Sequence, residues 1–316
     1  WARDYGYIRK GECVPSKDAF IKKNEVGAGR LKIRRRNFSS MARRYDRARG
    51  VVISIPKSGR TWLRVFLHAY CCMLAKREFT LDPHEIAASQ MPEFVFTHDL
   101  WEHLKTARLK DSFRGKHLVP PRAVETKPIL LLARDPRDVV VSLFFQLSKR
   151  TGQFHGTLSE IVADPKFGIE AIVEIMNTWI AEWSERSNFL LLRYEECRRN
   201  TRRAFAAMLA FFGFTEIDDE ALDRSLQFSS FENMKAMEAN KKFTTEILQP
   251  RDAADPDSFK VRRGIVGGYT QYLTAQDLAY IEQALASLDP RFGYHPTPAH
   301  EGVGDQRRQE LTEGTR

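Results

Sequence analysis

Short runs of apolar residues alternate along the chain with segments whose apolar positions recur at helical spacing. Four runs contain almost no polar position, namely 51–55, 94–96, 129–133 and 189–192. Strands that are buried on both faces have this pattern, because neither face contacts water. The runs therefore predict four inner strands of a sheet.

Helical patterns separate and follow these runs. Apolar residues recur three or four positions apart from Leu63 to Leu74, from Ile169 to Trp183 and from Phe205 to Phe212. Gly213 follows the third segment directly, where a helix commonly ends in a left-handed residue. Thr274, with an acidic residue three positions later, predicts the start of a further helix.

The order of these elements predicts the architecture. Strands that alternate with helices are typical of an α/β domain in which helices cover both faces of a mainly parallel sheet. Periodicity is weak before residue 49, and the sequence is polar after residue 296. We therefore expect a basic N-terminal extension over 1–48, one domain over 49–296 and a mobile tail over 297–316.

Composition excludes several classes of protein. With 42% hydrophobic residues in 316, the chain has enough apolar material for a core, so global disorder is excluded. The four cysteines lack zinc-site spacing, and their small number favours a reducing compartment, the cytoplasm. No apolar run reaches the ~20 residues that span a bilayer. No signal peptide opens the sequence, but it begins at Trp1 rather than Met, which leaves an upstream targeting segment open.

The net charge of +9 is concentrated near the N-terminus. Between Arg30 and Arg49 there are nine basic residues and one acidic residue, Asp46. Such a segment is either a patch for an anionic surface or substrate or a solvated, partly helical arm, and the second reading is favoured. The segment matches no nucleic-acid-binding motif, so no nucleic acid partner is expected.

The first apolar run is followed by a loop suited to a phosphate-like anion. A turn between a buried strand and a helix presents free backbone N–H groups, and the helix dipole adds positive potential there. In the loop 56–62, Lys57 and Arg60 add charge, while Ser58 and Thr61 add hydroxyl donors beside Gly59. The second glycine and the Gly-Lys-Ser/Thr ending of a Walker A loop are missing.

Two further segments carry arginines next to strand ends or glycines. Arg134 ends the third run on the same expected sheet edge, and Ser142 lies two turns into the following helix. Near the C-terminus, Arg262 and Arg263 precede Gly264, and paired guanidinium groups suit phosphate oxygens. The segment 241–258 before them is expected to be a mobile loop, and a lid is one interpretation of it.

These three motifs, in this order, resemble the PAPS-dependent sulfotransferase family, over about residues 50–296. PAPS is 3′-phosphoadenosine 5′-phosphosulfate. The first loop is similar to the family's Pro-Lys-Ser-Gly-Thr-Thr-Trp, with Arg60 in place of the first threonine. Arg134 and Ser142 match the family's 3′-phosphate pair. The stretch from Arg262 to Tyr269 resembles the family's Arg-Lys-Gly-x-x-Gly-Asp-Trp. It departs from this motif at three positions, where Arg263 replaces lysine, Gly268 replaces aspartate and Tyr269 replaces tryptophan.

The resemblance implies a fold like that of P-loop NTPases, PAPS as co-substrate, release of PAP and no metal. It implies that Lys57 stabilises charge on the bridging oxygen as the bond to PAP breaks. It also implies that Gly59, Trp62 and Gly264 contact the nucleotide, and that the adenine is contacted by Trp62, Tyr194, Ser229, Ser230 and Phe231. The three anionic groups of PAPS account for clustered Lys and Arg without a metal motif.

A general base is expected beyond the second apolar run. His98 follows it directly and aligns with the family's Lys-Thr-His histidine, and imidazole titrates in the range that base catalysis needs. Phe96 stands in place of the lysine of that motif. Asp99 and Glu102 are the rival bases.

The predicted reaction is in-line transfer of the sulfuryl group to an acceptor hydroxyl, with a saccharide or another polar small molecule favoured. Acceptor loops are expected over 82–90, 146–155 and 241–258. The alternatives are a P-loop nucleotide kinase and a non-catalytic PAP-binding protein. The family's usual C-terminal dimer motif is not seen, so the oligomeric state stays open.

Overall fold

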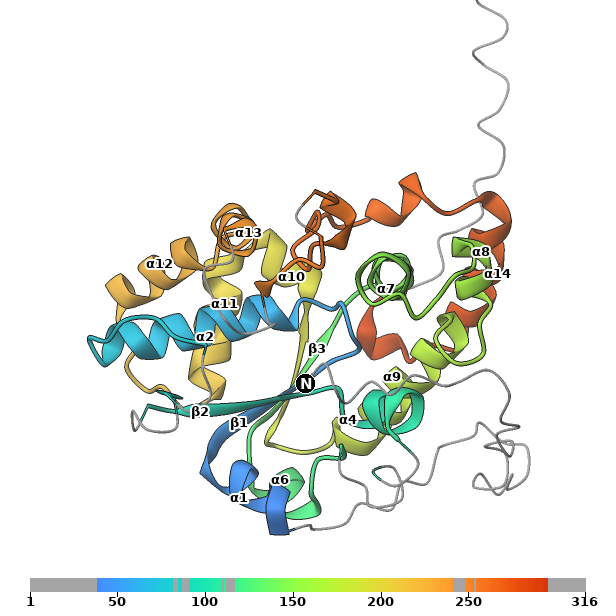
Figure 1. Ribbon diagram of the computed structural model, residues 1–316. Coiled ribbons are helices and arrows are strands. Elements are labelled where there is room, and N and C mark those ends of the chain that lie inside the picture. Colours follow the sequence, from blue (N-terminus) through green and yellow to red (C-terminus); the bar gives the residue numbers. More distant parts are fainter. Residues whose placement is uncertain are drawn as a thin grey trace, which may run out of the picture. The chain divides into compact units, whose positions relative to one another are not determined.

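A computed structural model of the chain describes residues 39–81, 85–86, 91–108, 111, 117–240, 248–252 and 254–294. In these ranges four strands form one parallel sheet (Figure 1). The strands are β1 (Ala48–Ile53), β2 (Glu93–Thr97), β3 (Ile129–Ala133) and β4 (Phe189–Arg193), in the order β2-β1-β3-β4. All four predicted strands are present, and the α/β prediction is confirmed.

Helices fill the connections between and after the strands. The longer ones are α1 (Ser39–Arg47), α2 (Arg60–Leu74), α7 (Pro136–Phe145), α9 (Ile169–Trp183), α11 (Thr201–Phe211), α12 (Asp219–Phe228), α13 (Phe231–Ala239) and α14 (Ala275–Leu285). The shorter α-helices are α4 (Asp99–Trp101), α6 (Pro121–Thr126), α8 (Leu158–Val162) and α10 (Tyr194–Arg199). Two π-helical turns are η3 (Glu102–Thr106) and η4 (Gln146–Arg150), and three 3₁₀ turns are η6 (Pro256–Ser258), η7 (Gly268–Gln271) and η8 (Pro290–Phe292).

The predicted helix ends are confirmed by their capping geometry. Gly213 follows the end of α11 with a φ of 81°, in the left-handed region. Thr274 forms a capping box at the start of α14, with the acidic residue three positions later, Asp277, as its partner. The Asp135 side chain caps α7, whose first residue is a proline. Neither α12 nor α13 is predicted from the sequence.

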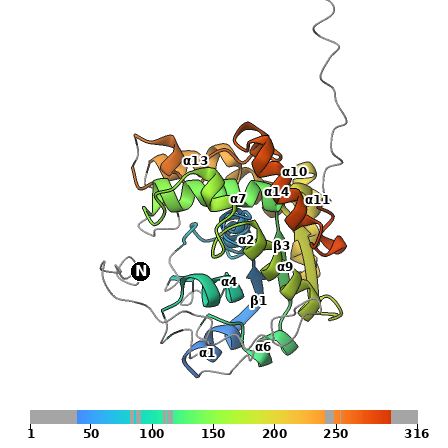
Figure 2. The ribbon, with the colours of Figure 1, turned by 90° about the vertical axis from the view of Figure 1, so that its right-hand side faces the viewer.

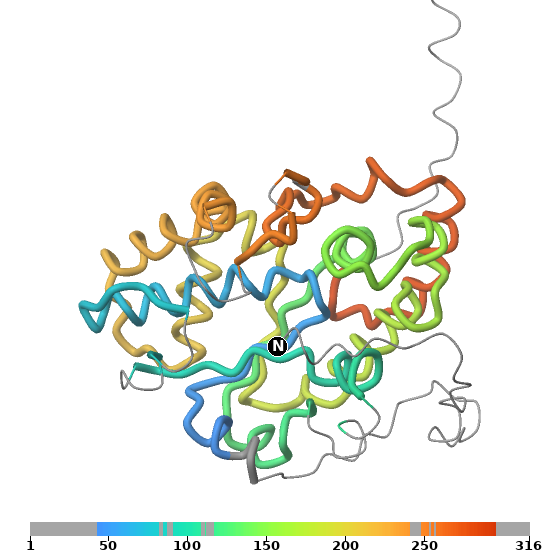
Figure 3. Tube along the Cα trace, in the orientation of Figure 1, coloured from blue at the N-terminus to red at the C-terminus, as the bar shows by residue number. Residues whose placement is uncertain are grey.

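One face of the sheet is covered by α2, α11 and α12. Because successive strand residues alternate between the faces, Val52 of β1 and Leu130 of β3 point to the same side. They pack with Phe66 of α2, Phe205 of α11 and Leu222 of α12 in one buried cluster. Figure 3 shows α2 running alongside the yellow and orange segment that contains α11 and α12.

The opposite face is covered by α9. The connections from β2 to β3 and from β3 to β4 are expected to be right-handed, which places their helices on the face opposite α2. Trp179 and Trp183 of α9 are fully buried, as expected of core residues, and their rings stack with centroids 6.3 Å apart. The helices α7 and α14 lie against α9 (Figure 2).

The last part of the predicted N-terminal extension is the helix α1, which is attached to the sheet. Tyr45 is buried, and the Lys127 ammonium donates to the Asp46 carbonyl at 2.7 Å. The boundaries at 48 and 296 stay predictions, since residues before 39 and the predicted tail lie outside the described residues. No helix in the described ranges is long and apolar enough to cross a membrane.

A methyl group at Gly50 is expected to destabilise the sheet, because a Cβ there would overlap two ring carbons of Phe212. Overpacking of this kind typically costs about 1–3 kcal/mol, so Gly50→Ala should lower the free energy of unfolding by that amount in urea titrations. Phe212→Leu should lower the free energy of unfolding less in the Gly50→Ala background than in the wild type. Additive costs for the two changes would contradict this account.

Candidate active site

The carboxyl ends of all four strands lie at one edge of the sheet, and each is followed by a predicted site residue (Figure 1). The loop with Lys57 follows β1, His98 follows β2, Arg134 follows β3 and Tyr194 follows β4. Open parallel sheets bind ligands at this edge. The fold therefore brings together residues that are up to 137 positions apart in the sequence.

Hydrogen bonds connect these strand ends to one another. The His98 Nδ1–H donates to the Ser54 carbonyl at 2.7 Å, which joins β2 to β1. The Arg134 guanidinium donates to the Lys57 carbonyl at 3.1 Å, which joins β3 to the loop after β1. The Asp135 backbone N–H donates to a carboxylate oxygen of Glu195 at 3.0 Å, which joins β3 to α10.

The loop after β1 has the backbone geometry of an anion cradle. Lys57 and Gly59 have φ values of 74° and 99°, which turn the chain sharply into α2. A side chain at position 59 would lie 2.7 Å from the Tyr194 ring, so only glycine fits. The backbone N–H groups of Gly59 and Thr61 have no acceptor among the described residues. They stand at the positive end of the α2 dipole.

The Lys57 ammonium, which comes from this loop, is partly deprotonated near pH 7. Burial, reinforced by the positive charge of Arg150, lowers its pKa to about 7, although Glu238 opposes the shift. Its Nζ lies 3.3 Å from the Gln146 side-chain oxygen on η4. An anion that binds in the loop would therefore restore the full positive charge on Lys57.

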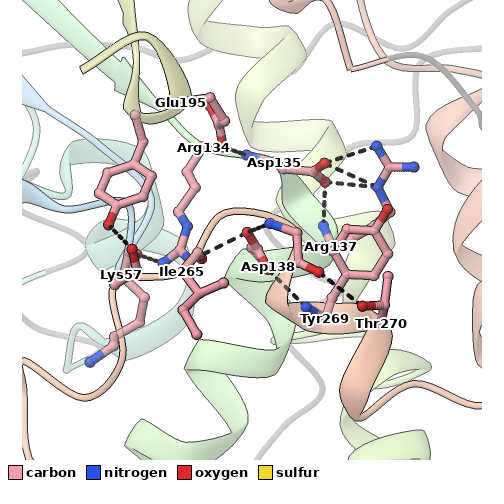
Figure 4. Close-up of polar contacts among 12 residues, drawn as sticks. Lys57, Arg134, Asp135, Arg137, Asp138, Glu195, Ile265, Tyr269 and Thr270 are labelled. Atoms are coloured by element: carbon pink, nitrogen blue, oxygen red, sulfur yellow. Dashed lines mark hydrogen bonds and ion pairs between the residues drawn. The ribbon is translucent and has the colours of Figure 1, made fainter. Parts of the chain in front are cut away.

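Arg134 holds the first loop against the glycine-rich segment near the C-terminus (Figure 4). Besides the Lys57 carbonyl, its guanidinium donates to the Ile265 carbonyl at 3.0 Å and lies 3.4 Å from the Asp138 carboxylate. The guanidinium also packs on the Tyr194 ring, 4.6 Å from its centroid. The Arg134 Nε–H is buried and has no partner among the described residues, so it is available to an anionic ligand.

Asp138 fixes the glycine-rich segment, a role that the sequence analysis misses. Its two carboxylate oxygens accept the backbone N–H groups of Gly267 at 2.9 Å and Tyr269 at 3.0 Å (Figure 4). In sequence, Asp138 stands in the first turn of a helix, where acidic residues are common for local reasons. No sequence signal separates that role from its contact with residues about 130 positions away.

The two arginines of the glycine-rich segment converge, as expected of a phosphate-binding pair. Arg262 and Arg263 both donate to the Tyr272 hydroxyl, at 2.9 Å and 2.7 Å. Arg262 also packs on the Phe145 ring, 3.9 Å from its centroid, whereas Arg263 is exposed. Gly264 follows them with a φ of 63°.

Three aromatic side chains form a wall beside Gly264. Trp62 and Tyr194 meet edge to face, 5.9 Å between ring centroids, and the Tyr194 hydroxyl donates to the Gly264 carbonyl at 3.2 Å. A Cβ on Gly264 would lie 2.8 Å from the Phe231 ring. An open cavity of about 450 Å³ lies next to Gly264, and it is lined by Glu195, Arg198, Arg199, Gly264, Ile265 and Val266.

Three predicted hydroxyl contacts have weaker geometric support. The Ser229 hydroxyl is fully buried and donates to the Ser225 carbonyl at 2.8 Å at the end of α12. The Ser230 hydroxyl caps α13 by accepting the Asn233 N–H at 3.2 Å. No hydrogen bond among the described residues joins the Ser142 hydroxyl on α7 to Arg134. The roles of these serines stay predictions.

His98 has the protonation state that a base requires. Because Nδ1 donates its proton to the Ser54 carbonyl, Nε2 carries the lone pair. Burial, together with the positive charge of Arg60, holds the pKa of His98 well below its usual value. The ring is therefore neutral near pH 7.

The rival base Asp99 is engaged inside the fold. It is fully buried, and its carboxylate accepts the Val119 N–H at 2.7 Å and the Trp179 Nε1–H at 2.8 Å. Glu102 lies on η3, 3.0 Å from the His117 Nδ1. The geometry therefore favours His98 over both carboxylates. No group of three or more His, Cys, Asp or Glu side chains within the described ranges could hold a metal ion.

Comparison with known proteins assigns the chain to a family. Residues 48–288 match the family model described as the sulfotransferase domain. The chain belongs to the sulfotransferase family.

Relatives of this sulfotransferase occur in an animal and in a plant. It is 28% identical over 238 residues to the 3-beta-hydroxysteroid sulfotransferase of Cavia porcellus, covering 71% of this chain and 77% of the relative. It is 26% identical over 251 residues to cytosolic sulfotransferase 16 of Arabidopsis thaliana, covering 73% of each chain.

Solved structures share its fold. A mouse sulfotransferase, SULT7A1, complexed with PAP has a TM-score of 0.52 and 18% identity, covering 75% of this chain and 81% of that one. Retinol dehydratase in complex with retinol and PAP has a TM-score of 0.53 and 19% identity, covering 77% and 83%. The predicted P-loop-like fold is confirmed.

Family membership also confirms the predicted enzyme class, a PAPS-dependent sulfotransferase with PAPS as co-substrate. The two alternatives that the sequence leaves open, a nucleotide kinase and a non-catalytic binding protein, are thereby set aside.

Replacing Asp99 is expected to affect stability rather than chemistry. In Asp99→Ala, the buried N–H groups of Val119 and Trp179 lose their acceptor, and each unsatisfied donor costs about 1–3 kcal/mol. Urea or thermal unfolding should show this loss, while the turnover of the remaining folded enzyme stays within about tenfold of wild type. Full stability with abolished turnover would instead make Asp99 the base.

Proposed function

We propose that this sulfotransferase transfers the sulfuryl group of PAPS in line to the hydroxyl of a polar acceptor, with His98 as the base. The observation that carries the proposal is the hydrogen bond from His98 to Ser54. It fixes the proposed base to Ser54, and Ser54 stands three residues before Lys57 of the anion cradle. The hydrogen bond thus holds the proposed base next to the end of β1, where the anion site begins. A base and an anion site that are fixed side by side are suited to act on the two sides of one transferred group.

The donor is proposed to lie along the carboxyl edge of the sheet. The loop 56–61 would hold the 5′-phosphosulfate through its backbone N–H groups, through Lys57 and Arg60 and through the hydroxyls of Ser58 and Thr61. Arg134, whose Nε–H is buried without a partner among the described residues, and Ser142 would bind the 3′-phosphate together with Arg262 and Arg263. The aromatic wall of Trp62, Tyr194 and Phe231 offers ring faces and edges to the adenine.

Lys57 is proposed to stabilise the charge that develops on the leaving oxygen. In the ligand-free protein its pKa of about 7 leaves it only partly charged, and the bound anion would complete its protonation. A cation that is desolvated and already in position stabilises a developing anion by about 3–4 kcal/mol.

His98 is proposed to take the proton of the acceptor hydroxyl on Nε2. As the acceptor oxygen bonds to sulfur, the bond from sulfur to PAP breaks, and the proton moves to the imidazole. The hydrogen bond from Nδ1 to the Ser54 carbonyl keeps Nε2 as the acceptor and stabilises the imidazolium that forms.

The acceptor is proposed to be a saccharide or another polar small molecule. The steroid sulfotransferases among the relatives are named for apolar acceptors, but here the charges of Arg64 and Lys260 act on His98 and that of Arg150 acts on Lys57. Of the expected acceptor loops, 146–155 is described and contacts Lys57 through Gln146. Most of 82–90 and residues 241–247 and 253 of the third loop lie outside the described residues.

The site of action is proposed to be the cytoplasm. Two relatives are named cytosolic sulfotransferases. A fluorescent fusion that is excluded from the cytoplasm would contradict this assignment.

Binding of PAP is expected to take up a proton through Lys57. At pH 8 the ammonium, with a pKa of about 7, is mostly neutral in the free protein, and the ligand's negative charge raises that pKa again. Titration calorimetry in buffers of different ionisation enthalpy should therefore show uptake of up to about one proton per PAP. Lys57→Met should abolish the uptake and weaken binding, and ATP should bind more weakly than PAP. Absence of PAP binding to the wild type would refute the proposed donor site.

His98→Ala should lower turnover by about 100- to 10,000-fold, because the acceptor hydroxyl then loses its base. The affinity for PAP should stay nearly unchanged, since the base faces the acceptor. Turnover in the presence of added imidazole should partly recover. A loss of less than about tenfold would rule out this role, and an equal loss of PAP affinity would indicate that His98 only supports the cleft.

A further inference from the structure

Two cations that the proposed phosphate sites do not use, Arg64 and Lys260, lie within electrostatic range of His98. Arg60, Arg64 and His68 are spaced four residues apart and so share one face of α2. The Arg64 guanidinium packs on the Phe96 ring of β2, 4.6 Å from its centroid, and the His68 ring meets the same ring edge to face. Phe96 stands two residues before His98, so this face of α2 lies next to the base.

Apart from the contact with the Phe96 ring, the Arg64 guanidinium has no polar partner among the described residues. Its guanidinium forms no ion pair and no hydrogen bond with any described residue, although it is more than half buried. Burial, together with the nearby charges of Arg60 and Arg44, lowers its pKa to about 9. A partly buried and unpaired guanidinium disfavours folding, so its presence points to a function other than stability.

Lys260, which precedes the glycine-rich segment, is within electrostatic range of Arg64. Its backbone N–H donates to the buried Glu238 carboxylate at 2.6 Å, and the next N–H, of Val261, donates to the other oxygen at 2.8 Å. Its ammonium has no hydrogen-bond partner among the described residues. Burial and the charges of Arg150, Arg64 and Lys57 hold the pKa of Lys260 well below its usual value.

The position of Arg64 separates it from the donor, whereas Lys260 is within electrostatic range of both Arg64 and the loop with Lys57. The proposed phosphate groups lie at the start of α2 and at Arg134, whereas Arg64 lies one turn further along α2, over β2. Both Arg64 and Lys260, by their charges, also depress the pKa of His98, which places them within electrostatic range of the base. The base faces the acceptor, so these cations lie on the acceptor side.

We infer that the acceptor carries an anionic group close to its reacting hydroxyl, and that Arg64 and Lys260 bind this group. A carboxylate, sulfate or phosphate would give the guanidinium and the ammonium hydrogen-bond acceptors that the described residues do not supply. The substrate class is thus an acidic hydroxyl compound, such as a uronic acid or a sugar that already carries an anionic ester. This inference rests on the proposed function, since it concerns the acceptor side of the same site.

The test compares matched acidic and neutral compounds on the PAP-saturated protein. Galacturonate against galactose, and 4-hydroxyphenylacetate against 4-hydroxyphenylethanol, differ mainly in the carboxylate. We expect titration calorimetry to show that the acidic member binds at least about tenfold more tightly in at least one pair, as expected for a charge-assisted pair. Galactose 6-sulfate and galactose 6-phosphate then determine which anionic group is preferred. Equal or weaker binding of both acids, or no binding of either, overturns the inference.

Three variants assign the preference to particular side chains. In Arg64→Met and in Lys260→Met, the preference for the acidic over the neutral compound should fall to less than about threefold while PAP still binds. Arg77→Gln, which removes an exposed arginine just beyond the far end of α2, should keep it. A preference that survives in both methionine variants overturns the assignment. Absence of PAP binding to the wild type would instead refute the proposed function, which keeps the two failures distinct.

A stability measurement separates ligand binding from a structural role. Arg64→Met removes an unpaired cation and leaves an apolar side chain on Phe96, so the melting temperature of the ligand-free protein should stay the same or rise. A fall of several degrees, together with an unchanged preference for acids, would mean that Arg64 supports the fold and would overturn its proposed role.

Discussion

The site depends on the hydrogen bonds that join neighbouring strand ends across the carboxyl edge of the sheet. Parallel pairing brings the four ends together, but it leaves each following loop free to move by itself. The bonds from His98 to Ser54, from Arg134 to Lys57 and from Asp135 to Glu195 remove that freedom. His98, the loop with Lys57 and the aromatic wall are thereby positioned relative to one another by short-range contacts rather than by long loops.

The sequence predicts the parts of this site that follow from local pattern. The strands, α2 and the placement of Lys57, His98 and Arg134 at strand ends need only periodicity and the geometry of a parallel sheet. The contacts of Asp138 and Gln146 are not predicted, because their partners lie 89 or more positions away. The environment of Lys260 is not predicted either, because the charges that act on it come from other elements. Local pattern also cannot show that the hydroxyls of Ser229 and Ser230 are engaged by helix ends.

Positive charge is distributed over the site at a cost in stability. Lys57, Arg64 and Lys260 are all desolvated, and for each of them burial is the largest cause of a lowered pKa. Close cations repel one another in a medium of low polarity, so the ligand-free site is the strained state of the protein. Anionic ligands relieve that repulsion, which makes charge neutralisation a large part of the driving force for binding.

Arg134 makes the two ligand loops mechanically dependent on a single side chain. Its Nη atoms clamp the carbonyls of Lys57 and Ile265, while its Nε–H remains open to a ligand. The Nε–H can therefore gain an acceptor without loss of either of these two hydrogen bonds. A substitution of Arg134 would accordingly loosen the loop with Lys57 and the glycine-rich segment at once, so the two segments are constrained together in evolution.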